Sequence, residues 1–200
     1  VVIHDDTLNR TTAHNGNVRD FTAAELAQVN AAAKFAGGWP DTTPVPLLRD
    51  VLKEWDDLKS IQLEVRTTHE NDLRIIAHLI RELVDELDLI DTAIVTSMDT
   101  HLLGYMHQTA PEIRRGYVAE RFTRDPLAMC QLYHCTHLIT NYHRVTPELV
   151  KAAHDVGLEV SVWTVNDLNI AHRIQHCGAD SIITDVPSLM LNNLRHDIEY

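Results

Sequence analysis

Apolar and polar positions follow two rhythms along this chain, and the two rhythms alternate from about residue 45 onward. Over residues 71–89, seven apolar side chains recur at intervals of three and four, which places them on one side of a helix, opposite Arg74 and Arg81. A run rich in β-branched residues follows at 92–97, and such a composition is typical of a strand. Helical and extended patterns in alternation predict a parallel sheet that is wrapped by helices.

The same alternation continues to the end of the chain. The predicted strands cover residues 61–66, 92–97, 115–119, 137–141, 160–165 and 181–185. The predicted helices cover residues 71–89, 126–133, 146–156 and 167–177, and two more start near residues 100 and 188. The clearest boundaries belong to helix 146–156, which Thr146 and Pro147 open and which Gly157 follows. Six strands, each followed by a helix after a short loop, indicate one continuous architecture.

The number of strand–helix units suggests most of a barrel. Eight units close a (β/α)8 barrel in about 250 residues, so six units in 200 residues are one or two units short. Residues 1–3 show a strand pattern with no helix before them, and we expect the missing units on the N-terminal side. We therefore predict an α/β TIM barrel that lacks its first one or two units. One partial barrel domain would span residues 1–200, with residues 5–45 as an insertion or loop region.

An open doubly wound sheet is the competing architecture. It is disfavoured because no glycine-rich GxGxxG segment follows any of the predicted strands.

Composition narrows the possible partners. The chain is 44% hydrophobic and 23% charged, which fits a single globular domain, and its formal charge of −12 argues against a nucleic-acid partner. It contains no apolar run of roughly 18 residues and no charged and apolar leader. Its three cysteines form no CxxC pair and cannot all close as disulfides within the chain, so a cytoplasmic location is favoured.

In a barrel the candidates for chemistry are polar residues at the carboxyl ends of the strands. The first candidate is His4, where a short apolar run ends in a histidine followed by Asp5 and Asp6. An imidazole can give and take a proton near neutral pH, as phosphodiester cleavage requires at the leaving oxygen. A plain turn at the end of a strand is the alternative.

Glu64 and Arg66 form the second candidate. They alternate with apolar residues in strand 61–66 and therefore share one face of it, which we expect to be the inward face. A carboxylate there suits a hard divalent cation, and a guanidinium can bind a phosphate oxygen through paired hydrogen bonds. A simple ion pair between the two side chains is an equally open reading.

Three further places carry weaker signals. Trp163 near the end of strand 160–165 suits the hydrophobic wall of a small-molecule pocket, although a strand tryptophan is also common in cores. Asp185 after the last strand is interpreted as a structural residue that caps the next helix. Residues 134–143 hold three histidines and one cysteine, but their spacing matches no usual zinc arrangement.

Taken together, these motifs resemble the glycerophosphodiester phosphodiesterase family. The likeness extends from the first residue to about Pro187. The stretches that carry it are His4–Asp5 with Leu8, Arg10–Thr12, Asp20–Thr22, Glu25–Leu26 and residues 45–48, and then residues 157–167, 178–180 and 184–187.

The resemblance implies a (β/α)8 fold in which two histidines act as general acid and base and three carboxylates bind a divalent cation, Mg2+ or Ca2+. His4 matches the family histidine that protonates the leaving alcohol, and Glu64 matches the metal-binding glutamate of the third barrel strand. Arg66 stands where the family more often has lysine, so a phosphate contact with different geometry is expected. Trp163 falls on the aromatic position that lines the glycerol end of the pocket. Met98 stands where many members place phenylalanine.

The implied reaction is metal-dependent hydrolysis of a small-molecule glycerophosphodiester to glycerol 3-phosphate and an alcohol. The family's opening His-Arg-Gly and Glu-x-Asp strands do not occur in these residues, so the isolated 200-residue piece is expected to be inactive. The alternatives are a lysophospholipase D or sphingomyelinase D-like lipid phosphodiesterase and a non-catalytic phosphate-binding remnant. Some relatives with a similar pattern at residues 97–99 follow an integral membrane region, so a membrane anchor outside this chain is compatible with the resemblance. The residues indicate no oligomeric state.

Overall fold

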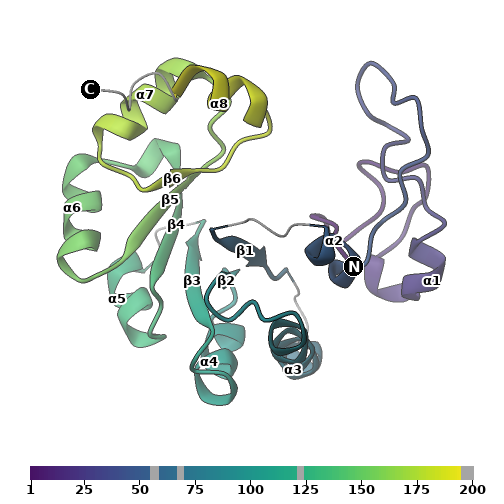
Figure 1. Cartoon of the computed structure of the whole chain (residues 1–200), viewed down its shortest axis with the longest axis horizontal. Helices are drawn as coiled ribbons and strands as arrows, with labels where there is room; N and C mark the ends of the chain where they lie inside the picture. Colours follow the sequence, from purple (N-terminus) through teal and green to yellow (C-terminus); the bar gives the residue numbers. More distant parts are fainter. Residues whose placement is uncertain (55–58, 67–69, 121–123, 195–200) are drawn as a thin grey trace.

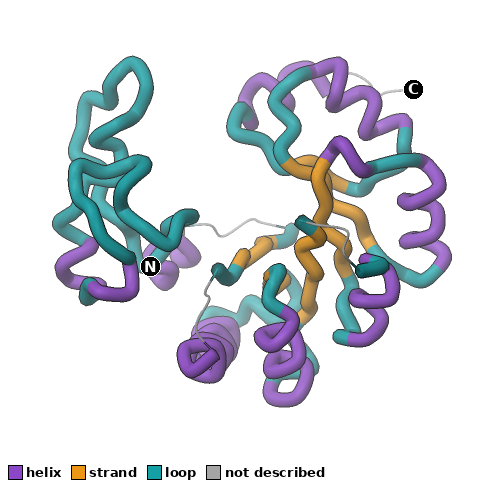
Figure 2. The backbone as a smooth tube through the Cα atoms, turned by 180° about the vertical axis from the view of Figure 1, so that it is seen from behind, coloured by secondary structure: helices purple, strands orange, loops and turns teal. Residues whose placement is uncertain are grey.

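The computed structural model describes residues 1–54, 59–66, 70–120 and 124–194 (Figure 1). Six parallel strands form one sheet in which every strand pairs with the next strand along the chain. The strands are β1 (Ile61–Glu64), β2 (Ala93–Ser97), β3 (Arg114–Ala119), β4 (His137–Asn141), β5 (Glu159–Trp163) and β6 (Ser181–Ile182). Figures 1 and 2 show that the sheet is curled, with the helices around its outside, so that it forms part of a ring.

A helix follows each of the six strands, and the first five of these helices return the chain to the start of the next strand, which confirms the six predicted strand–helix units. The helices are α3 (Glu70–Glu86), α4 (Thr100–Thr109), α5 (Pro126–Leu132), α6 (Pro147–Asp155), α7 (Leu168–His176) and α8 (Pro187–Leu194). The expected boundary of α6 is present: the Thr146 hydroxyl accepts from Leu149 N at 3.2 Å, and Gly157 adopts a φ of +77°. Among the described helices, none has the length and apolar character needed to cross a membrane.

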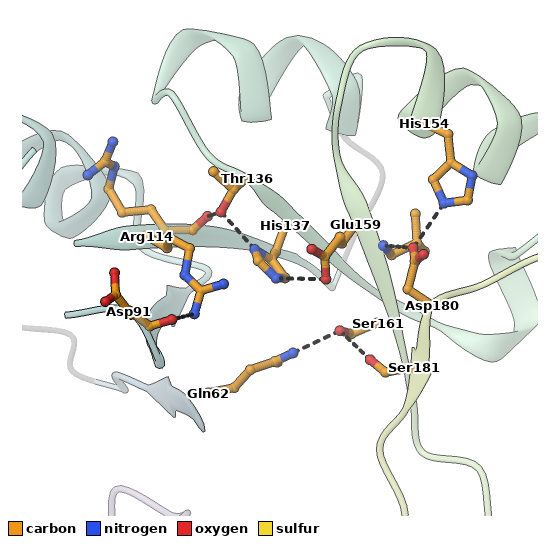
Figure 3. A network of polar contacts seen from close by, with 12 residues as sticks. Gln62, Asp91, Arg114, Thr136, His137, His154, Glu159, Ser161, Asp180 and Ser181 are labelled. Atoms are coloured by element: carbon orange, nitrogen blue, oxygen red, sulfur yellow. Dashed lines mark hydrogen bonds and ion pairs between the residues drawn. The ribbon is translucent and has the colours of Figure 1, made fainter. Parts of the chain in front are cut away.

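The two faces of the sheet have different roles. Side chains on the outer face, such as Leu138 and Val160, are fully buried against the helices. On the other face, Gln62 Nε2 donates to Ser161 Oγ at 2.8 Å, and Ser161 Oγ lies 2.7 Å from Ser181 Oγ (Figure 3). Because β1 and β5 are not neighbours in the sheet, the Gln62–Ser161 bond crosses the inside of the curl. The face that carries Gln62 is therefore the inner face.

The N-terminal residues form a separate lobe beside the sheet (Figure 1). Their short elements are η1 (Val18–Asp20), α1 (Ala23–Leu26) and α2 (Leu48–Lys53), and a further short helix, η2 (Tyr142–Arg144), follows β4. Leu8, Leu26, Val29 and Val45 make a small core within the lobe. Ion pairs from Arg19 to Asp72 and from Arg49 to Glu86 connect the lobe with α3.

Two expectations about strands were wrong. Residues 1–3 form no strand: Val2 N donates to Pro46 O at 2.9 Å, and proline has no N–H with which to return the bond. Several predicted strands also end earlier than expected, with β1 ending at Glu64, β5 at Trp163 and β6 at Ile182. The alternation of apolar and polar residues continues past these strand ends. Single backbone hydrogen bonds also continue there, for example from Val165 N to Ile183 O.

Candidate active site

The carboxyl ends of the six parallel strands lie at one edge of the curled sheet, where active sites of such folds are found. Glu64 is the last residue of β1, and Trp163 is the last residue of β5. The strand register pairs Glu64 with Thr96 and Trp163 with Asn141. The structure therefore places two of the predicted site residues at this edge.

Glu64 and Arg66 form an ion pair there. Arg66 Nη1 donates to Glu64 Oε1 at 3.2 Å. The Arg66 side chain is 32% exposed, and the Glu64 side chain is 37% exposed. Glu64 lies two residues after Gln62 in the same strand and so shares its inner face. The ion pair that the sequence left open is present, and its exposure leaves both charged groups accessible to a ligand.

His4 belongs to a charged cluster in the N-terminal lobe. Its Nδ1 atom lies 2.7 Å from Asp5 Oδ1. Arg10 donates two hydrogen bonds to the same carboxylate, from Nε at 2.6 Å and from Nη2 at 2.9 Å. The hydrogen bonds from Arg10, and then the contact with His4, hold the pKa of Asp5 well below its usual range. Asp5 is therefore ionised at neutral pH. The His4 side chain is 61% exposed.

The charge of a residue near the end of the last strand also acts on Arg10. The pKa of Arg10 is raised, first by its hydrogen bonds to Asp5 and in smaller part by the negative charge of Asp185. Asp185 comes three residues after the end of β6, and its carboxylate accepts a hydrogen bond from Asn166 Nδ2 at 2.8 Å. This electrostatic effect links Arg10 with a residue near the strand ends, and the convergence of His4 with Glu64 and Trp163 at one edge stays a prediction.

Trp163 is half-buried, with its ring at the inner side of the edge. Its indole Nε1 is buried, and the described residues offer this atom no hydrogen-bond acceptor. A buried indole N–H normally has a partner, so this donor is left unsatisfied among the described residues. The following peptide bond, Trp163–Thr164, is cis.

Comparison with known proteins identifies the family. The model of the glycerophosphoryl diester phosphodiesterase family matches residues 1–189. The chain belongs to this family. A glycerophosphodiester phosphodiesterase of Caldanaerobacter subterraneus is 28% identical over 98% of this chain and 80% of the relative's length. An uncharacterized protein of Bacillus subtilis, YqiK, is 31% identical over 96% of this chain and 81% of its own length.

Solved structures of phosphodiesterases share the fold. A phosphodiesterase of Oleispira antarctica, determined in complex with sn-glycerol-3-phosphate, superposes with a TM-score of 0.85 at 22% identity and covers 96% of this chain and 78% of its own. A glycerophosphodiester phosphodiesterase of Agrobacterium tumefaciens gives a TM-score of 0.72 at 23% identity, with coverage of 92% and 76%. The α/β half-barrel of this chain is thus the part of a TIM barrel that these proteins also contain. Which barrel units lie outside it stays a prediction.

Members of the family generally depend on a divalent cation. Glu64 fits one position in such a site, because it is an accessible carboxylate at the expected edge. Within residues 1–54, 59–66, 70–120 and 124–194, however, no three histidine, cysteine, aspartate or glutamate side chains are grouped to hold a metal ion. The described residues therefore supply a single candidate ligand and not a complete site.

Sequence reasoning did not assign roles to three residues that contact candidate site residues or Asp185. Asp5 and Arg10 orient His4, and the Asn166 side chain binds Asp185 while its Oδ1 accepts from Asp185 N at 2.9 Å. Asp185 is thus held by Asn166, and its predicted role as a cap of α8 stays a prediction. The signal for Asp5 was a carboxylate directly beside a candidate acid–base histidine, with an arginine five residues later.

Proposed function

We propose that this protein hydrolyses a glycerophosphodiester to glycerol 3-phosphate and an alcohol, with His4 as the general acid. The observation that carries the proposal is the contact of His4 Nδ1 with Asp5, whose carboxylate Arg10 fixes from the other side. An ionised carboxylate at Nδ1 accepts a hydrogen bond from that atom and so orients the ring. When the ring is doubly protonated, Nε2 carries the proton that the leaving group needs.

In the proposed reaction, an oxygen nucleophile from water attacks phosphorus and the bond from phosphorus to the alcohol oxygen breaks. The electron pair of that bond goes to the alcohol oxygen, which takes the proton from His4 Nε2. The residue that accepts the water proton is expected outside residues 1–200, as the resemblance implies for the family's other histidine. His4 thus supplies the acid half of the catalysis.

The reaction also requires that the negative charge on the phosphate oxygens be neutralised. A bound divalent cation, for which Mg2+ and Ca2+ are the candidates, would neutralise charge on the phosphate oxygens. We assign Glu64 as one of its ligands and Arg66 as a phosphate contact, which their shared position and accessibility support. Two further carboxylate ligands are expected from a part of the protein outside these residues.

Trp163 is proposed to line the glycerol end of the pocket. Its half-buried ring offers an apolar wall to the carbon chain of the substrate. The product complex of the Oleispira antarctica phosphodiesterase supports a substrate of this small size.

The test measures release of glycerol 3-phosphate from glycerophosphocholine by the full-length protein. We expect His4→Ala to lower kcat by about 10²–10⁴-fold, the usual contribution of general acid catalysis. His14→Ala is the matched control, because His14 is an exposed histidine of the same lobe that lies outside the cluster. A chelator should abolish hydrolysis, and Mg2+ or Ca2+ should restore it. Normal turnover by His4→Ala, or hydrolysis that resists the chelator, would contradict the proposal.

A further inference from the structure

A long loop projects from the N-terminal lobe and carries two aromatic side chains that the core does not use. Figures 1 and 2 show it as a narrow arm that projects from the lobe, and in Figure 1 it points away from α1. Every residue from 33 to 44 is exposed, and Phe35 and Trp39 are 57% and 53% exposed. Two large aromatic side chains at the end of an arm concentrate apolar surface in one place, and such patches mark interaction sites.

The base of the arm is firmly held. Ala31 N donates to Thr43 O at 2.7 Å, so the two ends of the arm are bonded to each other. Lys34 adds two bonds to the neighbouring segment, from its backbone N to Thr11 O at 3.0 Å and from Nζ to Asn9 O at 2.6 Å. The arm is therefore anchored up to Lys34, and the residues beyond it are presented to solvent from a fixed base.

The tip is built to present its two rings together. The Phe35 and Trp39 rings pack edge to face, with centroids 5.3 Å apart and planes inclined by 72°. Gly37 and Gly38 turn the chain between them with φ values of +88° and +79°, and a Cβ at either glycine would meet no atom within 4 Å. The rings are thus paired with each other across a tight turn that is surrounded by open space.

The composition of the tip indicates what it contacts. Residues 35–40 carry no charge, and the nearest charged residues, Lys34 and Asp41, flank them on both sides. Tryptophan combines a large apolar ring with one polar N–H, and this combination is enriched where a bilayer meets water. The uncharged aromatic tip is suited to insertion into the interfacial layer of a bilayer. The flanking charged residues, Lys34 and Asp41, are suited to stay in water and so limit the depth of insertion.

The available area favours a bilayer over a protein partner. Each side of an ordinary protein interface buries about 800 Å². Two aromatic side chains supply at most roughly 300–500 Å². A bilayer needs no complementary surface, so a narrow tip can insert without one. The formal charge of −12 disfavours anionic lipids and leaves apolar insertion as the driving force.

We propose that residues 35–40 are a membrane-docking tip, which inserts Phe35 and Trp39 into the interfacial region of a zwitterionic bilayer. The contact is peripheral and holds the N-terminal lobe, with His4, at a lipid surface. It is independent of the proposed hydrolase function, because docking requires none of the catalytic residues.

The experiment is co-sedimentation of the full-length protein with phosphatidylcholine vesicles. We expect the double variant Phe35→Ala, Trp39→Ala to lower the partition coefficient by about tenfold or more, since both apolar anchors are lost. The double variant Ile75→Ala, Leu79→Ala is the matched control, because these α3 residues are 59% and 54% exposed and lie outside the tip. Vesicles of brominated phosphatidylcholine should quench the fluorescence of the wild-type protein more than that of Trp39→Phe.

Four results would overturn the proposal. They are failure of the wild-type protein to bind, equal binding by the tip variant, equal loss in the α3 control, and binding that strengthens as phosphatidylserine replaces phosphatidylcholine. Sedimentation without lipid adds a check: self-association that disappears in the tip variant would show that the arm joins two copies of the chain instead. Each readout is measured without substrate, so an inactive protein that binds vesicles would reject the proposed hydrolysis and leave the docking tip standing.

Discussion

The imidazole of His4 and the carboxylate of its chain neighbour Asp5 are in direct contact, with 2.7 Å between Nδ1 and Oδ1. Asp5→Asn keeps the size of this side chain and removes its charge, so Nδ1 loses the anion that orients it. We expect kcat to fall by less than for His4→Ala, with KM nearly unchanged, because Asp5 acts through His4 and not on the substrate. Kinetics of glycerophosphocholine hydrolysis measure both constants. A rise in KM at constant kcat would show that Asp5 binds substrate.

Gly116 in β3 permits close packing inside the curled sheet. A Cβ at this position would lie 2.6 Å from Ile139 Cδ1 and 3.0 Å from Thr96 Cγ2. We therefore expect Gly116→Ala to destabilise the protein by about 1–3 kcal/mol, the usual effect of overpacking. Urea unfolding followed by circular dichroism measures the change.

Gly104 in α4 provides the matched control for that variant. A Cβ there would meet Tyr133 Cε1 at an ordinary 3.6 Å, and alanine favours a helix over glycine by roughly 1 kcal/mol. Gly104→Ala is therefore expected to leave the protein equally stable or more stable. Equal effects of the two substitutions would show that the inner face is less tightly packed than described.

Arg115 joins two loops on the outer side of β3. It is 5% exposed, and its guanidinium donates to Ile113 O at 2.7 Å and to His134 O at 3.0 Å, with longer bonds to three other carbonyls. Burial lowers the pKa of Arg115, but an arginine remains charged at any physiological pH.

Arg115→Met fills a similar volume and leaves those carbonyls without their donor. Each buried acceptor left unsatisfied costs about 1–3 kcal/mol, so we expect a loss of more than about 3 kcal/mol of unfolding free energy. Lys53→Met, at an exposed position of α2, should change stability by less than about 0.5 kcal/mol. Thermal and urea unfolding compare the two variants, and similar midpoints would contradict the structural role of Arg115.

The sequence predicted the regular elements well because their signals are local. The apolar stripe of α3 and the Thr146 cap of α6 are set by residues within a few positions of each other. The inner-face bond from Gln62 to Ser161 joins residues 99 positions apart, and no local pattern encodes it. Residues 1–3 were misassigned for a related reason, since an apolar run cannot reveal that its neighbour is Pro46, which has no N–H.

The candidate site was predictable only in part. The types and positions of Glu64 and Trp163 followed from placing polar and aromatic residues at strand ends. A relation of His4 to that edge stays a prediction, which is supported by the effect of the Asp185 charge on Arg10, a residue far from it in the sequence. Motif resemblance suggested a role for His4, whereas its contact with Asp5 required the structure.

A buried histidine at the opposite edge of the sheet predicts acid sensitivity. His137 opens β4 and its side chain is 4% exposed, with Nδ1 at 2.7 Å from Thr136 Oγ1 and Nε2 at 3.3 Å from Glu159 Oε2 (Figure 3). Desolvation lowers the pKa of His137 from the ordinary value of 6.5, and Arg114 lowers it further, whereas Glu159 and Asp180 act in the opposite direction. The folded protein therefore keeps this imidazole neutral at a pH where the unfolded chain would protonate it.

Because the unfolded state then binds more protons, the stability that depends on neutral His137 is complete above pH 6.5 and is lost as the pH falls below that value. We expect the unfolding free energy to decrease between about pH 7 and pH 5, and His137→Gln to reduce the slope because glutamine cannot titrate. His78→Gln is the control, since that imidazole is 68% exposed. Urea unfolding at several pH values gives the slopes. An unchanged slope in His137→Gln would mean that other groups cause the acid sensitivity, because Glu159, Arg114 and Asp180 are retained in that variant.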